Sequence, residues 1–508
     1  MATFLLQAVF LPIILAPLIY ILGRRVGSKI GWATIIILFY GLLMLLSAAV
    51  SNNSYIESYD WHPIGTFGLL ADGLSLPFAA TIYILSAALA IYSIPYMSHR
   101  IEEEVENVPS NQRLTETNNK FALYNSLYLL YAAGMLGTVL ATNLIQFYIF
   151  FELMLIPSYF LIAQFGYGER TKISFMYFIW THLGALILLA GILTLGLLSG
   201  SFDMPVIFES LSNGMYISSN VLLWIGLAFT VGLFVKLAAF GVHVWLPHAH
   251  ADAPTPISAL LSPAMIGIGG YALIRFLVQL IPSAYLKIAL ALSIWGLITM
   301  IYGGLMALSQ DDLKRLLAYS SVSQMGYIIF GIASSHYIGI SGSVLHYVSH
   351  GTGKAILFMV AGSIILQTGG IRKISSLGGL GSKLPLTAIA AALGFLTLIG
   401  VPPLNGFQAE WMLFSGAFSG AIASGSNLKL LIAIVALLST PLTAGYTLWT
   451  MKRIFFGTTP NNLENVKEAP MTIIIPIFFL AFVGLLLGIY PTLITERLIP
   501  AVIGIIGG

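Results

Sequence analysis

VGLFVKLAAFGVHVWLPHAHADAPTPISALLSP, residues 231–263, starts as an apolar helix that its prolines then interrupt. Pro247, Pro254 and Pro256 exclude an unbroken helix, because proline lacks an amide hydrogen and clashes with the preceding turn. Lys236 lies about three turns before the first of them. The stretch therefore predicts a discontinuous helix that carries a lysine close to its break.

The composition places this helix in a membrane. Of the 508 residues, 58% are hydrophobic and 8% are charged, and long continuous apolar runs recur along the chain. A β-barrel would alternate apolar and polar residues instead. The net charge of +3 suggests no nucleic-acid partner, and the absence of cysteine excludes disulfides and thiolate-bound clusters. We expect an all-α polytopic membrane protein with about 14 transmembrane helices, which begin near residues 3, 30, 73, 121, 143, 173, 220, 264, 286, 315, 338, 385, 428 and 470.

The basic residues predict the orientation. An even number of spans puts both termini on one side, and loops rich in lysine and arginine should then alternate, on the inner side. Lys287, Lys429 and Arg497 fall in the loops predicted to lie outside, and both termini are expected there. The loops predicted to face the cytoplasm, or the matrix or stroma of an organelle, contain Arg24, Arg25, Lys29, Arg100, Arg113, Lys120, Arg170, Lys172, Lys314, Arg315, Arg372, Lys373, Lys383, Lys452, Arg453 and Lys467.

Few ionisable residues are predicted within the spans. Such a group costs at least about 2.5–3.5 kcal/mol in hydrocarbon unless it is paired or hydrated, so each one is a functional candidate. Glu152, in FFELMLIPSYFLI (150–162), can bind a proton or remain ionised beside a cation, or it can make a structural hydrogen bond. Lys236 is a candidate for reversible deprotonation. We predict that movement of Glu152 relative to Lys236 loads and unloads a proton.

A second interruption lies in LIGVPPLNGFQAEWMLFSGAF, residues 398–418. Pro402 and Pro403 break the twelfth span, and Glu410 follows. Two broken helices five spans apart predict an inverted repeat of spans 4–8 and 9–13. The expected units are 1–120 (spans 1–3 and an inner loop), 121–283 (first repeat), 284–455 (second repeat) and 456–508 (the last span).

HYVSHGTGK, residues 346–354, places His346, His350 and Lys354 on one face of a helix over about 12 Å. Histidine titrates near neutral pH and can pass a proton between its ring nitrogens, so the ladder predicts a proton relay. The alternative is a set of buried side chains satisfied by neighbouring carbonyls, with Lys354 extending toward the inner interface.

Three further histidines, His243, His248 and His250, follow the break after Lys236. Their spacing is not specific for a metal, and no carboxylate predicted within a span lies close in sequence. We expect no metal site, and instead local hydrogen bonding or uptake of protons from the inner surface.

Several motifs resemble the antiporter-like proton-channel subunits of respiratory complex I, over about residues 70–455. They are ADGLSLPF, FELMLIP, VKLAAFGVHVWLPHAHADAPTPISALL, DDLKRLLAYSSVSQMGYI, HYVSHGTGKAILF and GVPPLNGFQAEW. The chain is most similar to the M type, because Glu410 stands where the L and N types have lysine. We also expect no long lateral C-terminal helix of the kind that the L type carries.

The resemblance implies roles for four residues. Glu152 would be the coupling carboxylate, Lys236 the proton-accepting lysine, His350 a member of the central hydrophilic axis and Glu410 the residue at the proton exit.

The sequence also departs from that family at three positions. Gly267 stands where the family has lysine, Gln324 where the M type has histidine, and His248 where aspartate is common. We therefore predict that the ladder of residues 346–354, with ordered water, takes over the central relay.

The resemblance implies a proton-translocating membrane subunit of a complex I-like oxidoreductase, in an energy-coupling membrane such as a bacterial, archaeal, thylakoid or inner organelle membrane. Redox chemistry, FMN, iron–sulfur clusters and the quinone would belong to partner subunits, with L-, N- and K-type neighbours in the membrane and no cofactor in this chain. The alternatives are the D-type subunit of a multisubunit Na⁺/H⁺ antiporter, the membrane subunit of an energy-converting hydrogenase, and a structural scaffold that has lost transport.

Overall fold

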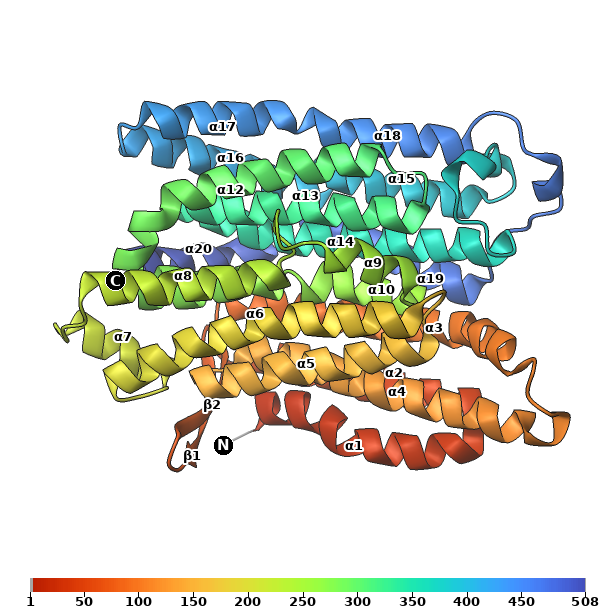
Figure 1. Cartoon of the computed structure of the whole chain (residues 1–508), viewed down its shortest axis with the longest axis horizontal. Coiled ribbons are helices and arrows are strands. Elements are labelled where there is room, and N and C mark those ends of the chain that lie inside the picture. Colours follow the sequence, from red (N-terminus) through yellow and green to blue (C-terminus); the bar gives the residue numbers. More distant parts are fainter. Residues whose placement is uncertain (1–2, 508) are drawn as a thin grey trace.

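The computed structural model describes residues 3–507, which form a bundle of long, roughly parallel helices (Figure 1). Twelve segments of these residues are long and apolar enough to cross a membrane. Three of them, Phe4–Ser51, Thr255–Leu280 and Asn427–Phe455, each contain two successive α-helices. The chain is therefore a predominantly α-helical membrane protein, as the composition predicts.

The described residues contain twenty α-helices, six short 3₁₀ or π segments and two strands. In chain order they are α1 (Phe4–Val26), η1 (Gly27–Lys29), α2 (Ile30–Ser51), β1 (Tyr55–Trp61), β2 (Gly65–Ala71), α3 (Ser75–Val105), α4 (Ser110–Leu140), α5 (Leu144–Phe165), α6 (Arg170–Ser199), α7 (Met204–Ser212), α8 (Ser219–Lys236), α9 (Trp245–Asp252), α10 (Thr255–Leu260), η2 (Leu261–Met265), α11 (Ile268–Ala272), η3 (Leu273–Leu280), α12 (Pro282–Leu308), α13 (Leu313–Ala333), α14 (Tyr337–Gln367), η4 (Ile374–Ser376), η5 (Leu380–Ser382), α15 (Pro385–Ile399), α16 (Asn405–Ala423), α17 (Asn427–Ser439), α18 (Pro441–Phe455), η6 (Asn461–Leu463), α19 (Met471–Ile489) and α20 (Thr492–Gly507).

The two ends of the bundle differ. The strands β1 and β2 and the short helix α7 lie at the left-hand end in Figure 1, which we call the hairpin face. Helix α1 begins and α20 ends at this face. The loops after α3, α14 and α18 lie at the opposite end, which we call the basic face because Arg113 at the start of α4, Arg372 and Lys467 lie there.

The hairpin is a departure from the all-α expectation. Strands β1 and β2 pair antiparallel, with Tyr55 opposite Ala71 and Trp61 opposite Gly65. Aromatic residues in β1 favour a strand, and the segment is too polar to continue α2. The Glu57 carboxylate accepts hydrogen bonds from the amides of Leu5 (2.8 Å) and Leu6 (2.9 Å). The hairpin therefore caps the first turn of α1, whose amide groups have no partner within the helix.

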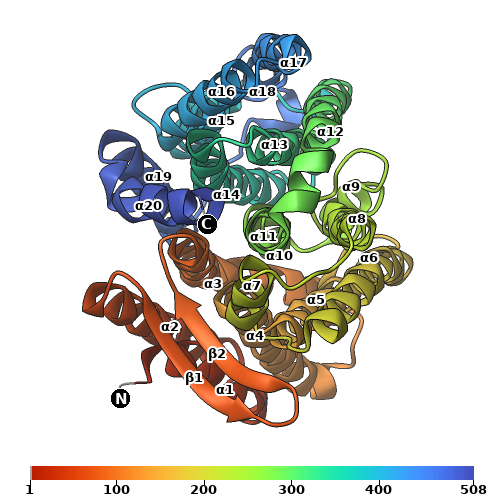
Figure 2. The same cartoon turned by 90° about the vertical axis from the view of Figure 1, so that its left-hand side faces the viewer.

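The helix α14 forms the centre of the bundle (Figure 2). Its residues from Gly339 to Ile364 are all buried. Glycines allow α16 to approach closely, because a side chain at Gly342 would overlap the backbone of Leu413. The ladder of residues 346–354 therefore lies in the protein interior, and Lys354 does not extend to the interface.

The chain is interrupted in both stretches where prolines predict a discontinuous helix, but the first interruption begins directly after Lys236, about three turns before Pro247, which lies within α9. Helix α8 ends at Lys236 and α9 begins at Trp245, while α15 ends at Ile399 and α16 begins at Asn405. Side chains satisfy the backbone of the first break. The Thr299 hydroxyl accepts from the Phe240 amide (3.2 Å), and Trp245 Nε1 donates to the carbonyl of Val235 (2.9 Å). Irregular backbone at this depth is thus paired with protein groups.

The last expected unit contains one helix beyond its expected span. Among the described residues after 456, only α19 is long and apolar enough to cross a membrane, and the shorter α20 (492–507) follows it. Arg497 of α20 donates a hydrogen bond to the carbonyl of Ala49 (2.6 Å) at the end of α2. This contact ties the C-terminal helix to the N-terminal helices at the hairpin face.

Candidate functional site

Glu152 lies on α5 and faces the neighbouring helix α6. Its Oε2 atom is 3.3 Å from Nδ1 of His182, and both side chains are partly exposed on the outer wall of the bundle. The other carboxylate oxygen is buried, and no described protein group donates to it. One oxygen of the Glu152 carboxylate therefore faces the outer wall of the bundle, and the other faces the interior.

Lys236 occupies the last position of α8, directly before the break. The side chain is buried, and its Nζ lies 4.7 Å from the ring centroid of Phe151, the residue before Glu152. The charge of Glu152 acts on this amine. Within the described residues, however, the ion pair of Glu152 is with His182 and not with Lys236. The two predicted partners are therefore neighbours without direct contact.

The ladder on α14 is fully enclosed. His346, His350 and Lys354 are each at most 2% exposed. No described group hydrogen-bonds the ring nitrogens of either histidine. Lys354 Nζ donates to the carbonyl of Leu317 (3.0 Å) and to the Ser320 hydroxyl, both on α13. A neighbouring carbonyl and a hydroxyl therefore satisfy Lys354, whereas the two histidine rings have no such partner among the described residues.

A polar stripe on α13 faces this ladder. Ser320, Gln324 and Tyr327 follow one another at helical spacing on one face. The Tyr327 ring stacks on His346 with centroids 5.1 Å apart and planes 10° apart. The buried amide of Gln324 has no partner among the described protein groups. Polar side chains therefore continue along this face of α13, including position 324, where the resemblance implies a histidine.

Glu410 lies near the end of this stripe, on the first turns of α16. Its charge acts on Tyr327 of α13 and on Tyr446 of α18. Its carboxylate also packs against the break, because a Cβ at Gly400 would lie 2.9 Å from Oε2. Gly400 has φ +75°, which favours glycine. The second break therefore positions the second intramembrane carboxylate.

The absent lysine at position 267 has a structural explanation. A side chain on Gly267 would overlap the ring of Tyr347, which occupies the space. The Tyr347 hydroxyl donates to the carbonyl of Ala264 (3.2 Å), and its ring lies 4.2 Å from that of Phe78. An aromatic cluster replaces an ionisable side chain here.

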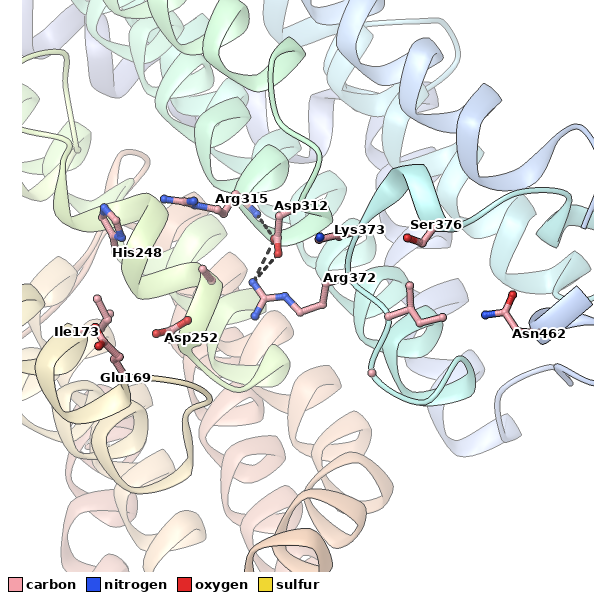
Figure 3. A pocket seen from close by; sticks show the side chains of 13 residues that line it. Glu169, Ile173, His248, Asp252, Asp312, Arg315, Arg372, Lys373, Ser376 and Asn462 are labelled. Atoms are coloured by element: carbon pink, nitrogen blue, oxygen red, sulfur yellow. Dashed lines mark hydrogen bonds and ion pairs between the residues drawn. The ribbon is translucent and has the colours of Figure 1, made fainter. Parts of the chain in front are cut away.

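A cavity of about 840 Å³ opens at the basic face (Figure 3). We call it the vestibule. The Arg372 guanidinium extends between Asp312 and Asp252 in this view, and it pairs with Asp312 at 2.9 Å. The lining residues are Glu169, Ile173, His248, Ala251, Asp252, Asp312, Arg315, Gly370, Ile371, Arg372, Lys373, Ser376 and Asn462.

The side chains of His243, His248 and His250 have different surroundings. His248 lines the vestibule, His243 Nε2 lies 3.2 Å from the Tyr302 hydroxyl, and the buried His250 stacks on Phe358. Across residues 3–507, no group of three or more histidine, aspartate or glutamate side chains is arranged to hold a metal ion.

Sequence reasoning missed two members of the site. His182 is an ionisable residue inside an apolar run, FIWTHLGALIL (178–188), and that signal could have found it. Tyr327 carried no comparable signal, because a tyrosine within a span is common. Its place beside His346 depends on the packing of α13 against α14.

Two helices interrupted within the membrane, each with an ionisable side chain at its break, define a membrane subunit of the transporter or antiporter type. Residues 141–440 match the family model described as NADH:quinone oxidoreductase/Mrp antiporter, transmembrane. The chain belongs to this family of antiporter-like membrane subunits of complex I and Mrp complexes.

Three comparisons illustrate the similarity. The F420H2 dehydrogenase subunit M of Methanosarcina mazei is 33% identical over 508 residues, covering 96% of each chain. A chain of respiratory complex I from Thermus thermophilus with bound NADH is 25% identical, with a TM-score of 0.84 and coverage of 99% of this chain and 100% of that one. A chain of the Mrp complex from Dietzia sp. is 26% identical with the same TM-score, and the match covers 99% of this chain and 52% of that one.

Proposed function

We propose that this chain translocates protons as a membrane subunit of a complex I-like oxidoreductase, with electron transfer to quinone in partner subunits. The relay would comprise Glu152 and Lys236, then His346, His350 and Lys354, and finally Glu410. The observation that carries the proposal is the series of buried ionisable and polar side chains from the vestibule to Glu410. Because buried polar groups are rarely left unpaired, ordered water is the expected partner of the histidine rings.

In this proposal the basic face is the inner side of the membrane and both termini lie outside. The excess of arginine and lysine in the loops of the basic face supports this orientation. We further propose 14 spans, with residues 121–283 and 284–455 as inverted repeats. The support is that α8/α9 and α15/α16 are interrupted helices at corresponding positions.

The partners follow from the same proposal. L-, N- and K-type neighbours would flank this chain, and FMN, iron–sulfur clusters and quinone would be bound by other subunits. Coupling would reach the chain at Glu152, which is exposed on the outer wall where a neighbouring subunit can change its position or charge. Moving one charge outward against a membrane potential of about 150 mV costs roughly 3.5 kcal/mol. A change of about that free energy in the proton affinity of the relay groups would be sufficient.

Protons would enter from the vestibule, where His248 lines the wall and His243 and His250 lie behind it. His248 stands where related chains have aspartate, and Asp252 provides a carboxylate one turn later on α9. Uptake therefore does not depend on the missing aspartate.

The D-type antiporter subunit is the second candidate, because the fold matches the Mrp chain as well as the complex I chain. The identity of at least 30% over nearly the whole length to an F420H2 dehydrogenase subunit favours the oxidoreductase.

The test is proton uptake coupled to quinone reduction in membrane vesicles, comparing the parent with Lys236→Ala after assembly is checked on a native gel. Loss of pumping together with most quinone reduction supports a coupled proton channel. Unchanged pumping and turnover would instead support a scaffold role or a proton path that does not pass Lys236. A sodium requirement in place of quinone-coupled pumping would favour the antiporter.

A further inference from the structure

Lys314, in the first turn of α13, is a buried cation that the relay above does not use. Its side chain is 1% exposed, and its Nζ donates to the carbonyl of Ala253, the residue after α9. The preceding residue, Asp252, lines the vestibule. A buried cation is costly unless it is paired, yet the direct hydrogen-bond partner of this one is a neutral carbonyl. Lys314 therefore lies directly behind the wall of the vestibule.

His250, on α9, is a buried imidazole that packs against α14. The charges of Lys314 and Lys354 both act on it. Its ring is fully buried and stacks on Phe358, one turn after Lys354, with centroids 5.0 Å apart. Neither ring nitrogen has a hydrogen-bond partner among the described residues. The imidazole is thus free to accept a proton on one nitrogen and release one from the other.

Lys314 and Lys354 converge on the same stripe of α13. Lys354 Nζ donates to the carbonyl of Leu317, and Leu317 follows Lys314 by three residues on that stripe. The axial rise between these two positions is about 4.5 Å. The two lysines and His250 therefore form a compact group between the vestibule and His350.

Gly267 offers no ionisable side chain to carry a proton from Lys236 to this group. There the ring of Tyr347 fills the space of the missing side chain and packs on Phe78. The Tyr347 hydroxyl is engaged by the carbonyl of Ala264.

We infer that Lys354 receives protons directly from the vestibule through Lys314 and His250, by a second uptake route that does not pass Lys236. In each step one N–H bond breaks and another forms. Lys314 gives a proton to one ring nitrogen of neutral His250, the ring releases the proton of its other nitrogen to the neutral amine of Lys354, and Lys314 regains a proton from the vestibule. This inference rests on the proposed proton translocation and specifies its uptake.

The test uses the assembled complex in membrane vesicles that oxidise NADH or reduced F420, whichever the parental vesicles use. Lys314→Arg keeps the charge and the hydrogen-bond donors, but arginine does not release its proton. We expect its proton-to-electron ratio to fall below the parental value but to stay above that of Glu410→Gln, because the route through Lys236 remains, whereas Lys314→His, which can titrate, keeps most of the parental ratio. Lys467→Arg, the same change at an exposed position of the basic face outside the vestibule, is the control and should keep the parental ratio.

A parental ratio in Lys314→Arg, while Glu410→Gln lowers it, would overturn the second route and leave the proposed function intact. A parental ratio in Glu410→Gln would overturn the proposed function itself. If Lys314→Arg does not assemble, His250→Phe carries the test, since it keeps the stack on Phe358 but cannot carry a proton. A fall in its ratio supports the route, and a parental ratio contradicts it.

Discussion

His182 Nδ1 lies 3.3 Å from Oε2 of Glu152, on the outer wall that α5 and α6 form. The side chains are 35% and 17% exposed, respectively, and the exposed neighbours Ile149, Ile156 and Leu183 are apolar. The same carboxylate acts electrostatically on the buried Lys236. Glu152 can therefore transmit a change at the wall of the bundle to the lysine at the first break.

His182→Leu should weaken coupling, because it removes the direct partner of Glu152. A hydrogen bond to a charged group contributes about 1.5–3 kcal/mol, so its loss should leave the carboxylate less firmly positioned beside the wall. The measurement is the proton-to-electron ratio in vesicles, with Ile179→Leu on the same wall as control. A parental ratio in His182→Leu would show that Glu152 acts without the histidine.

Gly400→Ala should impair transport through Glu410. Alanine at φ +75° costs about 1–2 kcal/mol, and its Cβ would lie 2.9 Å from Oε2 of Glu410. We expect several-fold slower proton uptake in an assembled complex. Gly425→Ala is the matched control, because φ is +61° there and no atom lies within 4 Å of the added Cβ. Equal rates in the two variants would contradict a positioning role for Gly400.

Restoring the lysine at position 267 should fail unless space is made for it. Gly267→Lys alone would collide with the Tyr347 ring, so we expect little assembled complex on a native gel. The double variant Gly267→Lys/Tyr347→Ala should recover assembly, because the truncation opens the space. Tyr347→Ala alone is the control for the cavity it leaves. Normal assembly of the single lysine variant would show that the aromatic cluster rearranges easily.

Sequence patterns identified the interrupted helices because proline acts locally, through its missing amide and its ring. The break after Ile399 contains Pro402 and Pro403, as predicted, whereas the first break begins directly after Lys236 and ends before Pro247. The hairpin did not follow from the same reasoning, since β1 depends on pairing with β2 and on the contact between Glu57 and α1.

The candidate site was predictable in its members but not in its contacts. Ionisable residues in apolar runs are visible in any sequence, and Glu152, Lys236 and Glu410 were found in this way. Whether a carboxylate faces the interior or the wall depends on which helices pack beside it, so the pairing of Glu152 with His182 required the structure. The filling of the space beside Gly267 by Tyr347 is likewise a property of two helices far apart in sequence.

The buried ion pair of Asp72 and Arg275 gives a further prediction, on stability. Arg275 Nη2 lies 2.6 Å and 2.5 Å from the two carboxylate oxygens of Asp72, while its other nitrogens donate to Tyr271 and Gln279. Burial alone would raise the pKa of Asp72, but the charge and hydrogen bonds of Arg275 outweigh burial, and the pKa lies below its ordinary value of 3.8. The contribution of the pair is therefore fully present above that value and is lost as the pH falls through the lowered pKa.

Arg275→Met should destabilise the chain by about 3–5 kcal/mol at neutral pH, because it leaves a buried carboxylate without its cation. Burial then raises the pKa of Asp72, so the sign of the pH dependence reverses: the variant should lose stability as the pH rises from 5 to 8, while the pair in the parent adds no slope over that range. Thermal unfolding of the purified complex at several pH values measures both effects. Asp72→Asn/Arg275→Met, which removes both charges, should regain much of the loss and show no such slope. A pH-independent loss in Arg275→Met would mean that packing of the guanidinium, and not its charge, stabilises this end of the bundle.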